Sequence, residues 1–125
     1  MIWKCEVVVI DKQNVKILLV GHNKEPTVNV ITNNLGQMRK IIGTENIEVL
    51  KHNDILIVFD ENAFRKQLPI NRVLDGINIR GDFFIAGNDS KNNDFKDLSE
   101  EQIEKYTKEF SLEKQIEQEE EQLEW

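Results

Sequence analysis

Short apolar runs separated by turn-forming residues are the feature that most limits how this chain can fold. The clearest runs are Val7–Ile10, Val15–Val20, Ile55–Phe59 and Phe83–Ala86, and Asn, Asp and Gly residues lie between them. Runs this short are typical of β-strands, and none approaches the roughly 20 apolar residues that a helix needs to cross a membrane. The pattern therefore predicts a β-rich chain without membrane contact.

The spacing of the runs indicates how the strands connect. Asp11–Asn14 separates the first two runs, and His52–Asp54 separates a later pair, which in both cases is typical of a hairpin. The predicted strands are Ile2–Ile10, Val15–Val20, Thr27–Thr32, Ile47–Leu50, Ile55–Phe59, Ile77–Ile79 and Phe83–Ala86.

A short helix is predicted after the third of these strands. Asn33 or Asn34 can cap its first turn, because an Asn side chain accepts hydrogen bonds from the unpaired N–H groups there. Apolar residues then recur at helical spacing from Leu35 to about Ile42, and Gly43 is a typical helix stop.

The last helix has the clearest start signal. Ser99 and Gln102 form a capping box, which places the first helical residue at Glu100. The side chains expected on its core-facing side are Ile103, Tyr106, Thr107 and Phe110.

Residues 61–78 carry a weaker pattern, because Pro69 prevents a regular helix through their middle. The side chains expected to reach the core from this segment are Phe64, Leu68, Ile70 and Leu74. Taken together, the elements predict an α+β fold: an antiparallel β-sheet with one short helix and a long C-terminal helix. Residues 1–110 should form a single α+β domain, and residues 111–125 an acidic C-terminal helical extension.

The negative charge is concentrated at the C-terminal end. Of 23 acidic and 16 basic residues, ten Glu and three Lys lie at or after Ser99, which leaves 13 of each sign before it. A neutral body gives no reason to expect nucleic acid binding or a DNA mimic.

The acidic segment after Phe110 allows two interpretations. It can fray in solvent, or Leu112, Ile116 and Leu123, at near-heptad spacing, can be ordered by a partner subunit. The acidic helix from Ser99 to Trp125 also supports an alternative function, in which it covers a basic surface on a host defence or nucleic-acid-binding protein and inhibits it.

Residues that commonly catalyse reactions or bind metals are few. Cys5 is the single cysteine, and neither His22 nor His52 has a metal-ligand partner three or four positions away. The sequence contains no nucleophile motif and no glycine-rich phosphate loop. We therefore expect no enzyme, no metal and no cofactor, and the absence of a signal peptide predicts a cytoplasmic protein.

Residues 71–94 instead carry the groups that bind a small nucleotide. Such a ligand needs an aromatic face for its base, amides or carboxylates for its ribose and an arginine for its phosphates. The candidate ligand-binding residues are Asn71, Arg72, Arg80, Phe83, Phe84, Asn92 and Asn93.

A structural role is the stronger interpretation when these residues are considered by themselves. Phe83 and Phe84 point to opposite faces of a strand, so they suit the cores of two layers unless a ligand covers one of them. Asparagines commonly form turns, and the two arginines can pair with Asp75 or Asp82.

Several motifs together resemble a small phage-associated domain of unknown function. They are the Pro-x-Asn-Arg turn at residues 69–72, the Gly-x-Phe-Phe-x-x-Gly strand at 81–87 and the helix start Asp-Phe-x-x-Leu-Ser-x-x-Gln at 94–102, within a match that covers most of residues 15–110. Size, composition and the order of strands and helices are also similar to the anti-Thoeris family of phage sponge proteins.

The anti-Thoeris resemblance implies a protein of the infected host cell that binds a cyclic ADP-ribose-type immune signal without hydrolysing it. The ligand would lie in a recess at a subunit contact of a homo-oligomer. Phe83 or Phe84 would stack on the adenine, Asn92 or Asn93 would clamp it, and Arg72, or else Arg80, would hold the pyrophosphate.

Overall fold

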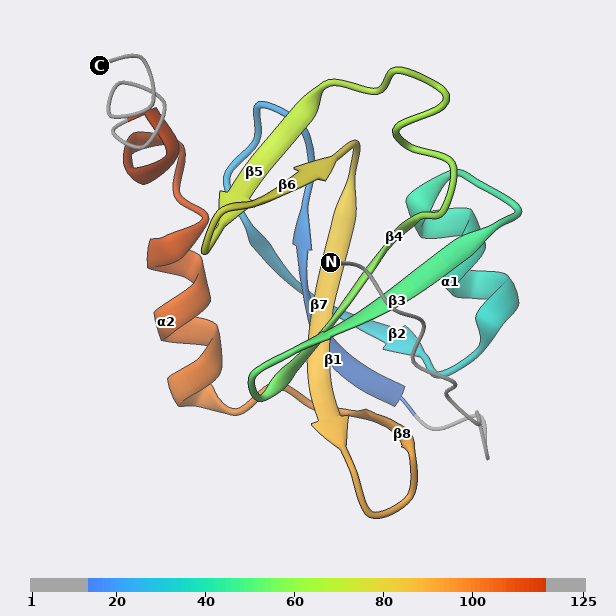
Figure 1. The fold of residues 1–125 in the computed structure, drawn as a ribbon. Helices are drawn as coiled ribbons and strands as arrows, with labels where there is room; N and C mark the ends of the chain where they lie inside the picture. Colours follow the sequence, from blue (N-terminus) through green and yellow to red (C-terminus); the bar gives the residue numbers. More distant parts are fainter. Residues whose placement is uncertain (1–13, 117–125) are drawn as a thin grey trace.

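The computed structural model describes residues 14–116 and shows a central β-sheet flanked by two helices and a separate β-hairpin (Figure 1). Every described strand pairing is antiparallel, which confirms the predicted α+β class and antiparallel sheet. The elements are β1 Asn14–Val20, β2 Thr27–Thr32, α1 Leu35–Ile42, β3 Ile47–His52, β4 Ile55–Asp60, β5 Ile70–Leu74, β6 Ile77–Arg80, β7 Phe83–Asp89, β8 Asp94–Lys96 and α2 Glu100–Glu109.

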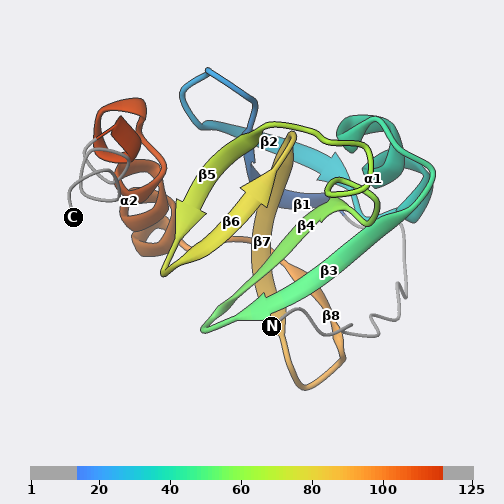
Figure 2. The same ribbon diagram turned by 45° about the horizontal axis from the view of Figure 1, so that its top comes forward.

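Strand β7 lies at the middle of the sheet, whose order is β2-β1-β7-β4-β3. It pairs with β1 and β4 on its two sides, and its far end pairs with β8. Strands β5 and β6 form a separate two-stranded sheet that crosses one face of β7 (Figures 1 and 2). The neighbours of β1 in the described sheet are β2 and β7; the predicted strand Ile2–Ile10 lies outside the described residues.

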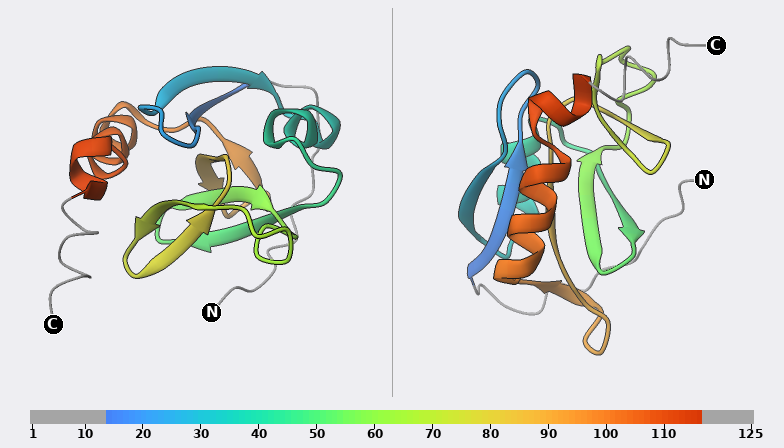
Figure 3. Two further views of the ribbon diagram at one scale, coloured as in Figure 1. Left: turned by 90° about the horizontal axis from the view of Figure 1, so that it is seen from above. Right: turned by 90° about the vertical axis from the view of Figure 1, so that its left-hand side faces the viewer.

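Two apolar layers cover the two faces of the sheet. Helices α1 and α2 lie at opposite ends of the molecule (Figure 3). The hairpin face, under β5–β6 and α2, buries Leu18, Val20, Leu50, Ile55, Ile57, Phe59, Leu74, Ile79, Phe83, Ile85, Leu98, Tyr106 and Phe110. The α1 face buries Val15, Ile17, Ile31, Met38, Leu56, Val58, Phe84, Ala86 and Phe95. Because both faces are covered, β4 and β7 are nearly continuous apolar runs rather than alternating ones.

The helix starts agree with the sequence prediction because their signals are local. The Asn34 side chain accepts from the Gln37 N–H at 3.1 Å, so Asn34 rather than Asn33 is the cap of α1. The helix stops at Gly43, whose φ of 82° is in the left-handed region that glycine adopts freely. Both bonds of the Ser99–Gln102 capping box are present at the start of α2.

Several predictions for the less regular segments are wrong. Strands β5 and β8 form where no strand was expected, because their partners β6 and β7 supply the ladder bonds. Phe64 and Ile70 are exposed by 79% and 40%, so neither is a core anchor, whereas Leu74 is buried as expected. Thr107 is exposed on α2.

The predicted long C-terminal helix is also wrong. Helix α2 ends at Glu109, and a separate helical segment begins at residue 112. At this break the Phe110 carbonyl accepts from Arg72 Nε at 2.8 Å, which ties the end of α2 to β5. The Ser111 hydroxyl then accepts from the Lys114 N–H at 3.2 Å and caps the next segment.

Gln115 attaches this last helical segment to β5. Its Oε1 accepts from the Val73 N–H at 2.6 Å, and its Nε2 donates to the Val73 carbonyl at 3.2 Å and the Glu109 carbonyl at 2.9 Å. The Gln115 side chain is buried, and it forms hydrogen bonds with backbone groups of β5 that do not face β6. A polar residue in a Glu-rich segment therefore has a structural role.

Gln115→Met should lower the free energy of unfolding by about 1–3 kcal/mol, because the Val73 N–H and carbonyl stay buried without partners. Urea unfolding of the full chain measures the difference. The exposed neighbour Lys114 provides the control, since Lys114→Met removes no contact to β5 and should change stability by less than about 0.5 kcal/mol. Equal stabilities of the two variants would contradict the role given to Gln115.

Tyr106 connects α2 to the turn between β3 and β4. Its ring is buried and stacks on Phe110 with centroids 5.9 Å apart, and its hydroxyl donates to Asp54 Oδ1 at 3.2 Å. Burial, reinforced by the negative charge of Asp54, raises the pKa of Tyr106 to about 12. The neutral phenol is therefore favoured by the folded state.

Folding should lose stability as the pH rises from about 10, the ordinary tyrosine pKa, towards about 12. Tyr106 is the single tyrosine of the chain, so ultraviolet absorbance of the phenolate reports this group alone. We expect a titration midpoint near 12 in the folded protein and near 10 in urea. Tyr106→Phe should remove this part of the pH dependence; a native midpoint near 10 would contradict it.

Candidate functional site

A recess of about 230 Å³ opens between the β3–β4 hairpin, β6 and the segment of residues 61–69. Its floor is apolar because strand side chains of the hairpin face end there, among them Leu50, Ile57 and Ile79. The volume is slightly below the range of about 300–1,000 Å³ that is usual for small-molecule sites. The recess can therefore enclose one flat ring or sugar and leave the rest of a larger ligand outside.

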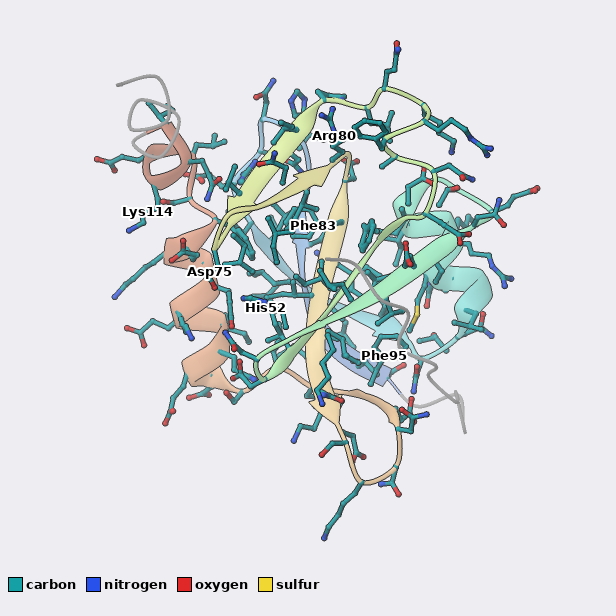
Figure 4. All side chains as sticks on the ribbon, viewed as in Figure 1. His52, Asp75, Arg80, Phe83, Phe95 and Lys114 are labelled. Carbon is teal, nitrogen blue, oxygen red and sulfur yellow. The ribbon has the colours of Figure 1, made fainter. Side chains whose placement is uncertain are left out.

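The mouth of the recess carries an aromatic ring beside an arginine. Phe64 is 79% exposed, and the guanidinium carbon of Arg80 lies 5.2 Å from the centre of its ring. Arg80 Nη1 also donates to the Leu68 carbonyl at 3.0 Å, which fixes the guanidinium at the end of β6 (Figure 4). The pair presents an apolar surface and a positive charge side by side.

Carboxylates line the opposite side of the recess. Asp60 is almost fully buried, and its carboxylate accepts from Lys66 Nζ at 2.7 Å, from the Thr44 hydroxyl and from the Asn62 N–H. Burial alone would raise the pKa of Asp60, but these bonds outweigh it and hold the pKa below its ordinary value. Glu48 and Glu61 also line the recess, so its polar groups are acidic on one side and basic at Arg80.

A second, shallower depression lies between the β3–β4 turn, β8 and the start of α2. It is polar and contains equal numbers of lysines and carboxylates, namely Lys51, Lys96, Lys105, Asp54, Asp97 and Glu101. Equal charges give no net attraction for phosphate, and no apolar floor is available for a base. The first recess is therefore the better candidate site.

A family model described as a domain of unknown function, DUF3846, matches residues 15–111. The chain belongs to the DUF3846 family. This confirms the resemblance to a domain of unknown function, and the match spans the strands and the loop segment that form the recess. Comparisons with curated proteins and with solved structures found no match.

The DUF3846 fold buries both phenylalanines that were candidates for a base platform. Phe83 packs edge-on against Phe110 with ring centroids 5.3 Å apart, and Phe84 lies in the core of the α1 face. Both side chains are 0% exposed, so neither presents a surface on which a base can stack. The expectation that one of them needs a ligand as its cover is corrected: the protein supplies both covers.

Arg72 and Asn71 are also inside the protein. Arg72 is 1% exposed and donates to the carbonyls of Phe110, Asn71 and Lys24 and to Asn71 Oδ1. Asn71 Nδ2 donates to the carbonyls of Val20 and Gly81 at 2.9 and 3.0 Å. Every one of these acceptors is a protein group, so the described geometry leaves the Arg72 fork no open side for a phosphate.

The remaining candidates, Asn92 and Asn93, lie at the exposed turn between β7 and β8. Asn92 donates to both oxygens of Asp89, and Asn93 has a φ of 52°, as turn asparagines often do. This turn is not part of the recess. Of the residues predicted from the sequence, only Arg80 lies in the recess.

Phe64 is the recess residue that the sequence reasoning assigned wrongly, as a core anchor. Its neighbours offered a signal, because Glu61, Asn62, Arg65, Lys66 and Gln67 are all polar. Among the described residues, no group of His, Cys, Asp and Glu is arranged to hold a metal ion. No helix in the described range is long and apolar enough to cross a membrane.

The two arginines should respond differently to the same substitution. Arg72→Lys should lower the free energy of unfolding by at least about 2 kcal/mol, because lysine cannot reach all the buried carbonyls. Arg80→Lys should cost less than about 1 kcal/mol, since Arg80 is partly exposed and makes one carbonyl bond. Urea unfolding of both variants measures the contrast, and a larger loss for Arg80 would contradict it.

Proposed function

We propose that this protein binds a cyclic ADP-ribose-type nucleotide in the recess beside β6 and holds it without hydrolysis. The observation that carries the proposal is the exposed Phe64 ring beside Arg80 at the mouth of a recess with an apolar floor. An aromatic face and a guanidinium are the groups that hold a base and a phosphate. The anti-Thoeris resemblance supplies the class of ligand.

The acidic side of the recess suits a ligand rich in hydroxyl groups. Ribose hydroxyls commonly donate to Asp or Glu in nucleotide sites, and a cyclic ADP-ribose carries two riboses. The same carboxylates would repel a phosphate placed beside them. The favoured pose therefore places the adenine against Phe64 and the apolar floor, a ribose towards the Glu48 side and the pyrophosphate at Arg80.

The residues that line the recess bear on whether a bound ligand is cleaved. The described lining contains no His, Cys, Ser or Thr, so it offers no usual nucleophile. It does contain carboxylates, which are the groups that cleave glycosidic bonds in other proteins. Binding and hydrolysis are therefore tested in one experiment.

Titration calorimetry with cyclic ADP-ribose should show binding that weakens by about 5- to 100-fold in Phe64→Ala, the range expected for losing one base stack. Arg80→Ala should weaken it further than the control Arg65→Ala, which removes an exposed arginine outside the recess lining. Heat-denaturing the complex should release intact ligand, and a hydrolysed product would replace the binding proposal with an enzyme.

Two further measurements distinguish the recess from the β7–β8 turn as the binding site, and ligand binding from protein inhibition as the function. If Asn92→Ala and Asn93→Ala abolish binding while Phe64→Ala does not, the ligand lies at the β7–β8 turn and the recess assignment is wrong. A truncation after residue 116 tests the alternative of an acidic protein inhibitor. Anti-defence activity lost by that truncation with ligand affinity unchanged would favour the inhibitor.

A further inference from the structure

Among the described residues 14–116, strand β2 is an edge of the central sheet, and it lacks the features that normally protect an edge. Its sequence, Thr-Val-Asn-Val-Ile-Thr, carries no charge and no proline, and its register with β1 is continuous over six residue pairs. Val28 and Val30 are 49% and 62% exposed on the same side of this strand. The opposite edge, β3, carries Glu48 and Lys51, which are the charges that usually discourage pairing.

The direction of the unpaired backbone groups of β2 follows from the bonds of β1. The Lys16 N–H donates to Asp97 Oδ1, and the Lys16 carbonyl accepts from the Leu98 N–H, so both point away from β2. Lys16 lies opposite Val30. The pair is therefore of the non-hydrogen-bonded kind, and the N–H and carbonyl of Val30 point outward from the sheet.

The direction of the N–H and carbonyl groups alternates from one residue to the next along a strand, so the groups of Val28, two residues from Val30, also point outward. The ends of this outward row are closed. Pro26 has no N–H, and the Thr32 N–H is already taken by Gln37 Oε1 at 2.6 Å. The free row consists of one N–H and one carbonyl on each of Val28 and Val30.

We propose that two copies of this chain associate by antiparallel pairing of β2 with β2, centred on Asn29. In that register Val28 of each copy lies opposite Val30 of the other, and the N–H and carbonyl groups of both valines form hydrogen bonds on each strand. A pairing centred on Val28 would place Pro26 opposite Val30, and Pro26 has no N–H for the Val30 carbonyl. A pairing centred on Val30 would place Thr32 opposite Val28, and the Thr32 N–H is already taken, so the Val28 carbonyl would lack a donor. The row is self-complementary, so a second copy is the partner that fits it.

This pairing also explains the two exposed valines. Each Val28 side chain would lie across from a Val30 side chain, and cross-strand pairs of β-branched residues stabilise a sheet. Two chains with a net charge of −7 repel each other, so an uncharged edge is a favourable place for them to meet. The proposal uses no residue of the recess and does not depend on the proposed ligand.

Sedimentation velocity of the full chain over a range of concentrations tests the association. We expect a dimer that dissociates on dilution, and Val30→Lys should weaken it at least tenfold by placing two new charges in the interface. Ile116→Lys is the matched control, since Ile116 is 56% exposed outside the central sheet. A wild type that is monomeric at every soluble concentration would overturn the proposal, as would a dimer that Ile116→Lys disrupts and Val30→Lys does not.

Disulfide trapping tests the register. In a Cys5→Ser background, Asn29→Cys places two thiols directly opposite, at a Cα separation of about 4.5 Å that suits a disulfide. Val28→Cys places its two thiols on diagonal positions about 7–8 Å apart, beyond easy reach. Air oxidation should cross-link the first variant and not the second on a non-reducing gel; the reverse result would exclude the Asn29-centred pairing.

Discussion

The buried guanidinium of Arg72 holds together parts of the chain that are far apart in sequence. Its donors reach the carbonyl at the end of α2, the carbonyl of Lys24 in the loop before β2, and both oxygens of Asn71 on β5. Burial lowers the pKa of Arg72, and the negative charge of nearby Glu25 opposes this shift. An arginine nevertheless stays charged inside a protein. A buried charge is tolerated only when its hydrogen bonds are made, so these segments must assemble together.

This assembly explains why the C-terminal part of the chain folds back instead of extending. The Phe110 carbonyl is used by Arg72, the Phe110 ring packs on Phe83, and Gln115 fills the free backbone positions of β5. The β5–β6 hairpin is thereby fixed over one face of the sheet. The position of the hairpin determines whether the recess forms, because β6 supplies Arg80 at its mouth and part of its apolar floor.

Local signals predicted the elements that depend on local chemistry. The caps at Asn34 and Ser99 and the stop at Gly43 lie where the sequence placed them, because a cap bond forms within a few residues. The break after Glu109 carries no glycine or proline; its local signal is Ser111, which caps the next segment, and the bond from Arg72 to the Phe110 carbonyl comes from 38 residues away. Tertiary contacts of this kind cannot be inferred from periodicity.

For the candidate site, the sequence predicted the kinds of side chain but not the residue that supplies the aromatic ring. An aromatic ring beside an arginine was expected, but the double phenylalanine of β7 drew the prediction towards the most apolar strand. Residues that are apolar on both faces of a central strand are those that the core needs most. Phe64 lies in a mostly polar segment and reaches Arg80 because the β5–β6 hairpin brings the end of β6 back beneath segment 61–69.

The positions of the recess and of β2 constrain how binding and assembly can be related. The recess adjoins β3 and β4 at one edge of the five-strand path, and β2 forms the other edge. A dimer through β2 would leave both recesses open at the outer ends of a continuous sheet. The sequence resemblance implied a ligand at a subunit contact, and this arrangement separates the two. Each copy would then bind ligand with its own residues, and dilution to monomers would leave ligand affinity unchanged, whereas a ligand shared between subunits would be lost with the dimer.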